Sequence, residues 1–322
     1  MRCVVFGDGA WTVEAIRRLG NAGHDVCGIV LRRQPTDDSL PSYARESGLV
    51  CLQPDSVNAP ESVARLRALA PELCVSVFYD QIIREPLLSL APRGFINLHP
   101  GKLPSYRGRA AIHWAMINNE PEIGVTVHLM NAHADAGAVL VQRTVPVDFH
   151  DTYASVVARV RAEVPGIVVD AVEGLATGAI TPVPQPVLGS YFGERGEGDE
   201  WIDWNQSSLQ IYNFIRALSP PGPVARTRSG DQVFLVQAAQ YDPAWPKYIA
   251  TNGQVVGIED GRARVKTGDS TILLTSVARA GGSLDAAPRF AISTRFLTPA
   301  LELRRLRADV ERLQRQLEER SR

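Results

Sequence analysis

Two polar side chains in the middle of the chain have the types and spacing of a catalytic pair. Asn97 and His99 form an Asn-x-His pair at the end of residues 94–99, an alternating apolar run that Pro100 and Gly101 stop. Residues two apart on a strand face the same side, so the amide and the imidazole project together from its carboxyl end. Open α/β sheets place their ligand crevices at this edge.

An amide beside an imidazole suits acyl transfer. The amide N–H can donate a hydrogen bond to a developing oxyanion, and the imidazole can move a proton near neutral pH. A nearby carboxylate would orient the imidazole and favour its charged form. Taken singly, an Asn or a His at a strand end is typical of a turn or a cap, so the prediction depends on the combination.

A longer stretch resembles the formyltransferase family that uses 10-formyltetrahydrofolate as formyl donor. The shared motifs are an Asn-x-His strand end, a Leu-Pro-x-Tyr-Arg-Gly loop, a Gly-Val-Thr-Val-His strand and an Asp-Ala-Gly turn. In this chain these are residues 97–99, 103–108, 124–128 and 135–137. The resemblance implies formyl transfer to a primary amine, with Asn97, His99 and Asp135 as the catalytic residues.

The resemblance also implies which residues hold the formyl donor and the acceptor. Residues 76–83 resemble the loop that grips the pterin of formyl-folate. The implied folate contacts are Gln81, Ile82, Ile83, Arg109, Asn131, Ala132, His133 and Ala134. The predicted contacts to the acceptor substrate lie in the loop after the Asn-x-His pair and are Lys102, Tyr106 and Arg107.

No catalytic metal is expected from the histidine pattern. His113, His128 and His133 lack the short spacing to each other, or to a Cys or Glu ligand, that is typical of zinc sites. His128 lies on an alternating strand and is interpreted as structural.

The acceptor is predicted to be a nucleotide-linked amino sugar. Residues 106–114 look most like the bacterial enzyme that formylates UDP-4-amino-4-deoxy-L-arabinose and relatives that act on other nucleotide-linked amino sugars. The alternatives are methionyl-tRNA formylation, or formylation of another small amine such as hydroxyornithine. The polar loop predicted at residues 31–43 carries two arginines against two aspartates. Methionyl-tRNA formyltransferases have a longer basic insertion there, so a nucleic-acid partner is not expected.

The composition predicts a cytoplasmic protein without membrane association. The chain has 322 residues, is 45% apolar and has a formal net charge of −1, so it can bury a sizeable core and lacks a generally basic surface. It has neither about 18 consecutive apolar residues nor a signal-like N-terminus. Its four cysteines lie in or beside apolar runs without Cys-x-x-Cys spacing, which favours buried free thiols.

Residues 1–180 alternate strand and helix patterns, which predicts an α/β catalytic domain with a Rossmann-like, mostly parallel sheet. The expected strands are 2–7, 25–31, 49–52, 73–78, 94–98, 123–130 and 138–146. The expected helices are 10–22, 59–70, 84–91, 109–119 and 151–177.

The remaining sequence predicts a linker, a smaller domain and a terminal helix. Residues 181–200 are rich in Pro, Gly and charge. Residues 201–298 combine a helix at 207–218 with short strands at 232–238, 253–258, 262–267 and 271–277, which predicts a barrel-like domain of the oligonucleotide-fold (OB) type. In residues 299–322 apolar side chains recur in steps of three and four, which predicts an amphipathic helix with a heptad seam that favours a homodimer.

Overall fold

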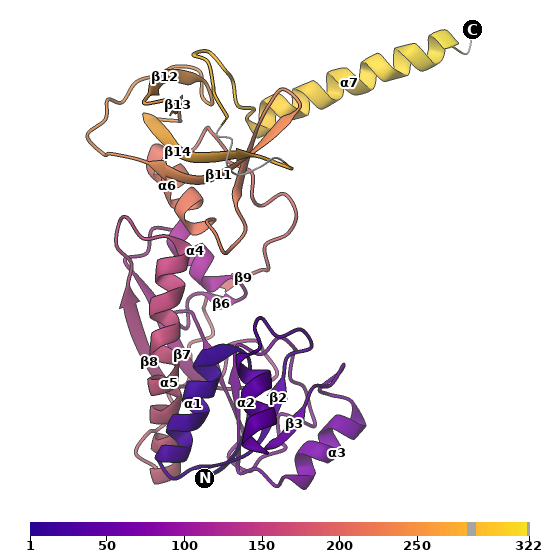
Figure 1. Ribbon diagram of the computed structural model, residues 1–322, viewed down its shortest axis with the longest axis vertical. Coiled ribbons are helices and arrows are strands. Elements are labelled where there is room, and N and C mark those ends of the chain that lie inside the picture. Colours follow the sequence, from indigo (N-terminus) through magenta and orange to yellow (C-terminus); the bar gives the residue numbers. More distant parts are fainter. Residues whose placement is uncertain (282–287, 321–322) are drawn as a thin grey trace. The chain divides into compact units, whose positions relative to one another are not determined.

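A computed structural model describes residues 1–281 and 288–320 (Figure 1). The chain divides into two compact units. Unit 1 comprises Met1–Ala115, Pro121–Phe149 and Ser155–Glu194, and unit 2 comprises Met116–Glu120, His150–Ala154 and Arg195–Arg322.

A seven-stranded sheet organises unit 1, in the order β3-β2-β1-β4-β5-β7-β8. The strands are β1 (Arg2–Gly7), β2 (Asp25–Leu31), β3 (Val50–Leu52), β4 (Leu73–Val77), β5 (Phe95–His99), β7 (Glu122–Leu129) and β8 (Val139–Pro146). The first five pair in parallel, whereas β7 is antiparallel to both β5 and β8. The predicted α/β class is therefore confirmed, and each of the seven strands lies within one residue of its predicted bounds.

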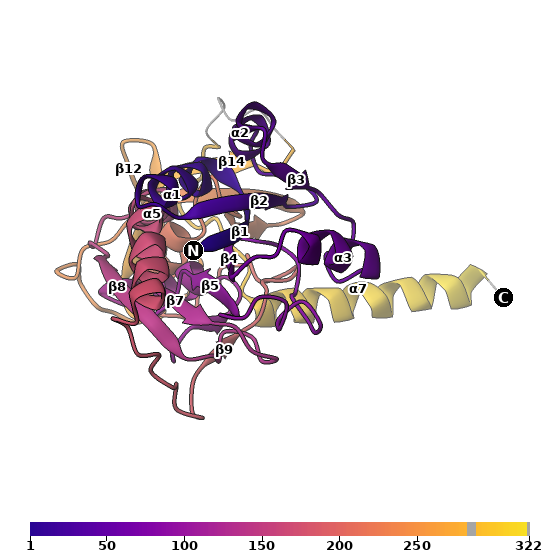
Figure 2. The same ribbon diagram turned by 90° about the horizontal axis from the view of Figure 1, so that it is seen from below.

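Helices cover both faces of this sheet, which explains why β1 and β4 are apolar on both faces. α3 (Pro60–Ala68) packs with Val4 and Phe6 on one face. α1 (Gly9–Asn21) and α5 (Tyr153–Thr177) lie side by side against the other (Figure 2). The Arg161 guanidinium of α5 lies 3.9 Å from the centre of the Trp11 ring of α1.

The prediction of a polar loop at residues 31–43 is wrong in its second half, where α2 (Ser39–Ser47) begins. Leu40 and Ala44 are one helical turn apart and both buried, so packing stabilises a helix in a segment of polar composition. The helix ends at Gly48, whose φ of +68° suits the left-handed C-terminal cap.

The helix predicted at residues 84–91 is also wrong, because this segment is a succession of turns. Pro86 lacks an N–H, and only five residues separate it from Pro92, which leaves too little chain for a regular helix. The apolar residues of the segment are nevertheless buried: Leu87 and Ala91 pack in the same core as Phe95. The remaining helix of this half, α4 (Ala111–Ile117), falls inside its predicted range.

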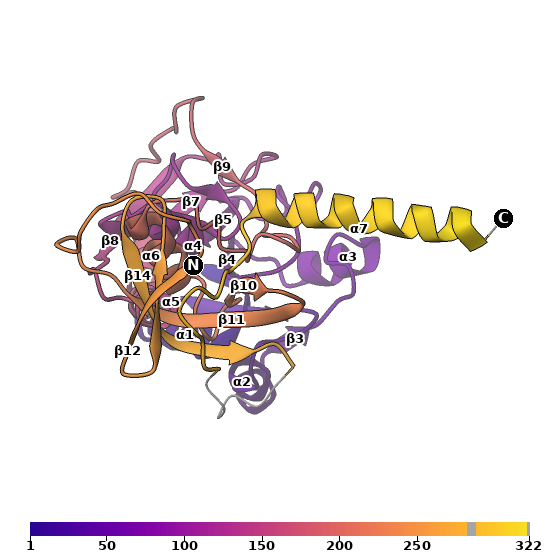
Figure 3. The ribbon, with the colours of Figure 1, turned by 90° about the horizontal axis from the view of Figure 1, so that it is seen from above.

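Unit 2 is built on a five-stranded antiparallel sheet in the order β10-β11-β14-β13-β12 (Figure 3). Its strands are β10 (Ala225–Ser229), β11 (Gln232–Gln240), β12 (Val255–Glu259), β13 (Arg262–Lys266) and β14 (Thr271–Arg279). β10 was not predicted. The last helix is α7 (Pro299–Arg320).

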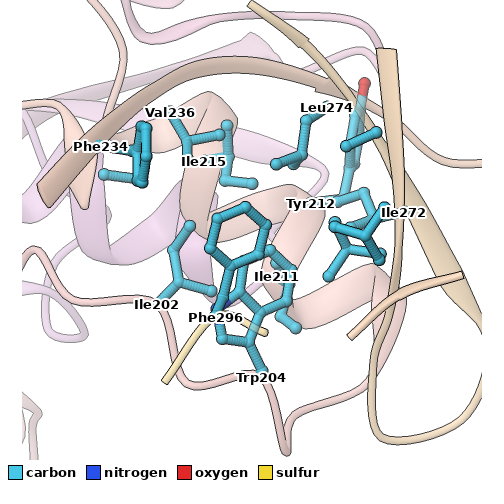
Figure 4. Packing of buried hydrophobic residues seen from close by; sticks show 14 of the residues in the cluster. Ile202, Trp204, Ile211, Tyr212, Ile215, Phe234, Val236, Ile272, Leu274 and Phe296 are labelled. Carbon is cyan, nitrogen blue, oxygen red and sulfur yellow. The ribbon is translucent and has the colours of Figure 1, made fainter. Parts of the chain in front are cut away.

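α6 (Ser208–Ala217) packs against β11 and β14 and closes the core of unit 2. Ser207 and Gln210 form a capping box that starts this helix: the Gln210 N–H donates to the Ser207 hydroxyl, and the Ser207 N–H donates to the Gln210 side chain. Trp204 and Phe296 stack at the centre of the core, with ring centres 5.5 Å apart (Figure 4).

The structure tests two smaller predictions. None of the described helices combines the length and apolar character needed to cross a membrane. Cys3, Cys27 and Cys74 are buried free thiols as predicted, whereas Cys51 is exposed because the short strand β3 lies at the edge of the sheet.

Candidate active site

The antiparallel pairing of β5 with β7 places two of the site's side chains opposite each other. In this register Asn97 pairs with His128, and His99 pairs with Thr126. Directly opposed residues on an antiparallel pair project from the same face with their Cβ atoms about 5 Å apart. The Asn97 amide nitrogen accordingly lies 3.4 Å from His128 Nε2.

The Asp-Ala-Gly turn between β7 and β8 brings Asp135 to this pair. Gly137 is required there, since a Cβ at this position would overlap the carbonyl oxygen of Leu129. Asp135 itself has φ of +50°, a left-handed conformation that residues other than glycine adopt only when their surroundings impose it.

The two carboxylate oxygens of Asp135 face different partners. Oδ1 lies 3.5 Å from the Asn97 amide nitrogen and 3.4 Å from His128 Nε2. Oδ2 accepts a hydrogen bond of 2.8 Å from the Gly108 N–H and lies 3.5 Å from His99 Nδ1. Asn97, His99 and Asp135 therefore lie close together, and Asp135 contacts each of the other members of the cluster.

Backbone carbonyls fix the tautomers of the two imidazoles. His99 Nε2 lies 2.7 Å from the Tyr106 carbonyl, and His128 Nδ1 lies 2.8 Å from the Leu129 carbonyl. A carbonyl only accepts, so each of these nitrogens carries a proton. His99 Nδ1 is consequently free to receive a proton on the side that faces Asp135.

The electrostatics of the cluster keep His99 neutral and Asp135 charged near pH 7. Burial lowers the pKa of His99 below its ordinary value of 6.5, although the negative charge of Asp135 opposes the shift. Burial alone would raise the pKa of Asp135. The neighbouring imidazoles of His128 and His99 and the hydrogen bond from the Gly108 N–H outweigh that effect, so the pKa of Asp135 is lowered.

A pocket of about 360 Å³ opens beside the cluster, within the size range of small-molecule sites. It is lined by Ser76, Tyr79, Asp80, Gln81, Ile82, Ile83, Asn97, Gly108, Arg109, His128, Met130, Asn131, Ala132, His133, Ala134 and Asp135. All eight residues predicted to contact folate are among them. His99 is not in this lining and is 4% exposed, so it lies behind Asp135.

The chemistry of the pocket lining suits a flat heterocycle that carries N–H groups. Ile82, Ile83 and Met130 supply apolar surface. Within the described part of the chain, the Tyr79 hydroxyl and Asp80 Oδ1 are buried and have no hydrogen-bond partner. Buried polar atoms normally find partners, so these two are suited to bind N–H and carbonyl groups of a ligand such as a pterin.

The three predicted substrate contacts lie outside this lining. Lys102 forms a salt bridge with Glu122 on the neighbouring strand. Tyr106 is buried and stacks on Phe192, with ring centres 4.9 Å apart. Arg107 is 3% exposed and donates to the side chain of Gln185, so it has a partner inside the fold.

Sequence reasoning missed the position of His128, which was interpreted as structural and lies in the cluster. It also missed the Gly108 N–H and the Gln185 side chain. His128 could have been assigned to the site only by pairing β5 with β7 in the correct register. No short-range sequence pattern specifies that register. Among the described residues, no group of three His, Cys, Asp or Glu side chains could hold a metal ion.

The fold and the site together define a two-unit α/β protein with an amide, two imidazoles and a carboxylate at the edge of its sheet. Residues 1–172 match the model of the formyl transferase family, and residues 196–294 match that of the formyl transferase C-terminal domain. The chain belongs to the formyl transferase family.

Solved structures share this architecture. WlaRD, a sugar 3N-formyl transferase, is 17% identical with a TM-score of 0.65, and the match covers 88% of this chain and 99% of WlaRD. An N-formyltransferase from Helicobacter canadensis is 16% identical with a TM-score of 0.65, covering 84% and 98%. HypX from Aquifex aeolicus is 21% identical with a TM-score of 0.59, covering 86% of this chain but only 44% of HypX. This chain thus spans less than half the length of HypX.

Proposed function

We propose that this protein transfers a formyl group from 10-formyltetrahydrofolate to the primary amine of a nucleotide-linked amino sugar. The observation that carries the formyl-transfer part is the pocket of a formyl transferase domain with Asn97, His128 and Asp135 on its wall. The structure of WlaRD was determined with dTDP and 5-N-formyl-tetrahydrofolate, and the Helicobacter enzyme with folinic acid and dTDP-3-aminofucose. Both match this chain over nearly their whole length, which supports an amino-sugar acceptor.

Two of the three arginines between residues 32 and 45 are paired with carboxylates, which gives little support to a tRNA acceptor. Arg32 lies 3.2 Å from Asp8 and 3.6 Å from Asp80, so two carboxylates of the same unit already pair with its positive charge. Arg45 forms a salt bridge with Asp38 on the exposed side of α2. A phosphate backbone is bound by arginines and lysines that face solvent unpaired, so this segment is a poor electrostatic match for nucleic acid.

Several residues of the pocket are suited to hold the formyl donor. Ile82, Ile83 and Met130 would contact the pterin, while Tyr79 and Asp80 would pair with its polar edge. When bound, 10-formyltetrahydrofolate supplies the activated formyl carbon that a neutral amine can attack.

The chain's own residues then perform two tasks. The Asn97 amide donates to the oxygen that gains negative charge as the amine adds. The proton released by the amine goes to the Asp135–His99 pair, in which Asp135 faces the pocket and His99 Nδ1 stands 3.5 Å behind it. While it holds this proton, the pair is a carboxylate beside an imidazolium, which attract each other. As the bond between the formyl carbon and the folate nitrogen breaks, the pair would return the proton to that departing nitrogen, so tetrahydrofolate leaves neutral at this atom and the pair regains its starting charge.

The proposed function predicts formylation of one or more nucleotide-linked amino sugars. The full chain, 10-formyltetrahydrofolate and a panel of UDP-, dTDP- and GDP-linked amino sugars would be assayed for tetrahydrofolate release and for the mass of a formylated product. We expect kcat/KM of about 10⁴–10⁸ M⁻¹s⁻¹ for the true acceptor. The same nucleotide sugars with a hydroxyl in place of the amine are the matched control and should release no tetrahydrofolate.

Two results would overturn the acceptor assignment. One is formylation of methionyl-tRNA with no reaction on the amino-sugar panel. The other is formylation of hydroxyornithine or a comparable free amine, again without reaction on the panel. Either result would leave formyl transfer itself in place.

We further propose that α7 joins two copies of the chain in a parallel coiled coil. Its apolar stripe consists of Leu303, Leu306, Val310, Leu313 and Leu317, which are 51–65% exposed. These residues occupy consecutive a and d positions of a heptad, so the stripe is complementary to itself across a two-fold axis.

The coiled coil is tested by sedimentation of three proteins at micromolar concentration. The unaltered chain should be a dimer, and Leu313→Glu should be a monomer, because a charge at a d position stays unpaired in the seam. Arg315→Glu is the matched control, since position 315 lies on the outer face of the same helix, and it should remain a dimer. A monomeric unaltered chain, or a dimer that Leu313→Glu leaves intact, would contradict the proposal.

A further inference from the structure

Residues 183–192 of unit 1 connect the two loops that hold the Asp135 carboxylate. At one end, Val183 pairs with Val139 at the start of β8. At the other end, β9 (Tyr191–Phe192) pairs with β6 (Arg107–Gly108). The segment was expected to be part of a plain linker, but it lies between the Asp-Ala-Gly turn and the loop that contains Gly108.

Gln185 is the residue of this segment that contacts both loops. Its amide nitrogen donates to the carbonyl oxygens of Asp135 and Gly137, at 2.8 and 2.7 Å. Its amide oxygen accepts from Nε and Nη2 of Arg107, at 3.0 and 2.8 Å. The side chain therefore uses both donors and both lone pairs. Carbonyls only accept and a guanidinium only donates, so the orientation of the amide is determined.

These bonds close a ring around the carboxylate. Gln185 holds the backbone of Asp135 on one side and the side chain of Arg107 on the other. Gly108, the residue after Arg107, donates its N–H to Asp135 Oδ2 at 2.8 Å. Gly108 has φ of +92°, and a Cβ there would overlap the Phe192 carbonyl, so β9 fixes the direction of this N–H.

We infer that Gln185 is a positioning residue that sets the Asp135 carboxylate against His99 and Asn97. Asp135 occupies a left-handed backbone conformation, which is unfavourable for a residue with a side chain and persists where surrounding contacts offset its cost. Gln185 supplies that enforcement through two hydrogen bonds to the turn. The inference rests on the proposed function, because it requires Asp135 to act in the reaction.

Arg107 connects Gln185 to the loop that contains Gly108. It is 3% exposed, and the acceptors it contacts are the Gln185 amide and, at 3.0 Å, the Pro186 carbonyl. A guanidinium stays charged when buried, so these neutral acceptors are needed to hold it. Loss of the Gln185 side chain would leave Arg107 Nε without its acceptor and free the loop that presents Gly108.

Gln185→Glu is the sharpest test. Glutamate keeps the side-chain length and the acceptor for Arg107, but it places an oxygen against two carbonyls and removes both donors to the turn. We expect kcat to fall by about 10–100-fold, because displacement of a reacting group by about 1 Å costs up to 100-fold. KM for both substrates should change by less than about threefold, and the acid limb of the kcat profile should move to lower pH as Asp135 leaves His99.

Gln53→Ala is the matched control. The Gln53 amide also donates to two backbone carbonyls of unit 1, those of Arg32 and Arg33, but it lies outside the pocket lining. It should keep kcat within about twofold of the unaltered protein. Thermal unfolding of both variants would show that neither has lost its fold. A Gln185→Glu enzyme with the kcat and pH profile of Gln53→Ala would overturn the inference.

Combination with Asp135→Asn separates this inference from the proposed function. If Gln185 acts through Asp135, the second substitution should add little to the loss that Asp135→Asn causes alone. An equal loss in both backgrounds would show that Gln185 acts independently and would contradict the inference. An Asp135→Asn enzyme that stays fully active would instead contradict the proposed function.

Discussion

Asn97→Ala is expected to lower kcat by about 10²–10³-fold while the protein remains folded. Removal of one donor to a developing oxyanion costs roughly 2.7–4 kcal/mol of transition-state stabilisation. In the ground state the Asn97 amide makes only long contacts, 3.4 Å to His128 and 3.5 Å to Asp135. Its strongest hydrogen bond is therefore expected in the transition state, and kcat and kcat/KM should fall equally.

Steady-state kinetics and thermal unfolding would check this result together. Asn21→Ala removes an exposed amide from the same unit and serves as the control, with activity expected within twofold of the unaltered chain. Activity of Asn97→Ala within tenfold of the control would rule out Asn97 as the oxyanion donor. A large rise in KM with unchanged kcat would instead indicate that the amide binds substrate.

Asp135→Asn is expected to lower kcat by about 10²–10⁴-fold, the range that a positioned general base contributes. The asparagine keeps the shape of the side chain but removes the charge that stabilises a protonated His99. Because the negative charge of Asp135 raises the pKa of His99, its removal lowers that pKa further.

The pH profile gives Asp135→Asn a second, independent readout. The reaction requires neutral His99, so activity falls as pH drops through the pKa of His99. This limb lies below pH 6.5 in the unaltered protein and should lie at still lower pH in Asp135→Asn. Protonation of the amine substrate affects both proteins equally, so the difference between the profiles reports on His99. An acid limb that stays in place would contradict the pairing of the two residues.

Asp170→Asn is the control for the carboxylate substitution. Asp170 pairs with Arg143 outside the site in the same unit, and its side chain is 46% exposed. Its loss should leave kcat and the pH profile unchanged. If it reduced activity as much as Asp135→Asn, the effect of the latter would reflect the fold of unit 1 rather than the reaction.

The sequence predicted the sheet of unit 1 well because buried parallel strands carry their own pattern. Continuous apolar runs such as residues 73–77 indicate strands without reference to other residues. It predicted α6 for the same kind of reason, since the apolar stripe that includes Ile211, Phe214 and Ile215 lies within the helix itself. It failed at residues 39–47, where burial of Leu40 and Ala44 stabilises a helix in a segment of polar composition, and at residues 84–91, where the apolar residues suggested a helix that Pro86 and Pro92 prevent.

The candidate site was predicted in its residue types but not in its arrangement. Asn97 and His99 were expected to face the substrate together, yet His99 lies behind Asp135 and only Asn97 reaches the pocket. Lys102 and Arg107 were predicted to contact the acceptor, and in the structure they contact Glu122 and Gln185. Each of these outcomes depends on a partner at least 20 residues away along the chain.

The sequence by itself determined which groups are available for chemistry: an amide and an imidazole on one strand end, and a carboxylate in a tight turn that only glycine can follow. Backbone sterics and side-chain alternation act over a few residues, so a short stretch of chain specifies them. The tertiary structure alone decided that His128 stands opposite Asn97 and that Gln185 reaches Asp135. Strand register and loop packing are set by contacts between distant segments, and the free energy of those contacts exists only once the chain has folded.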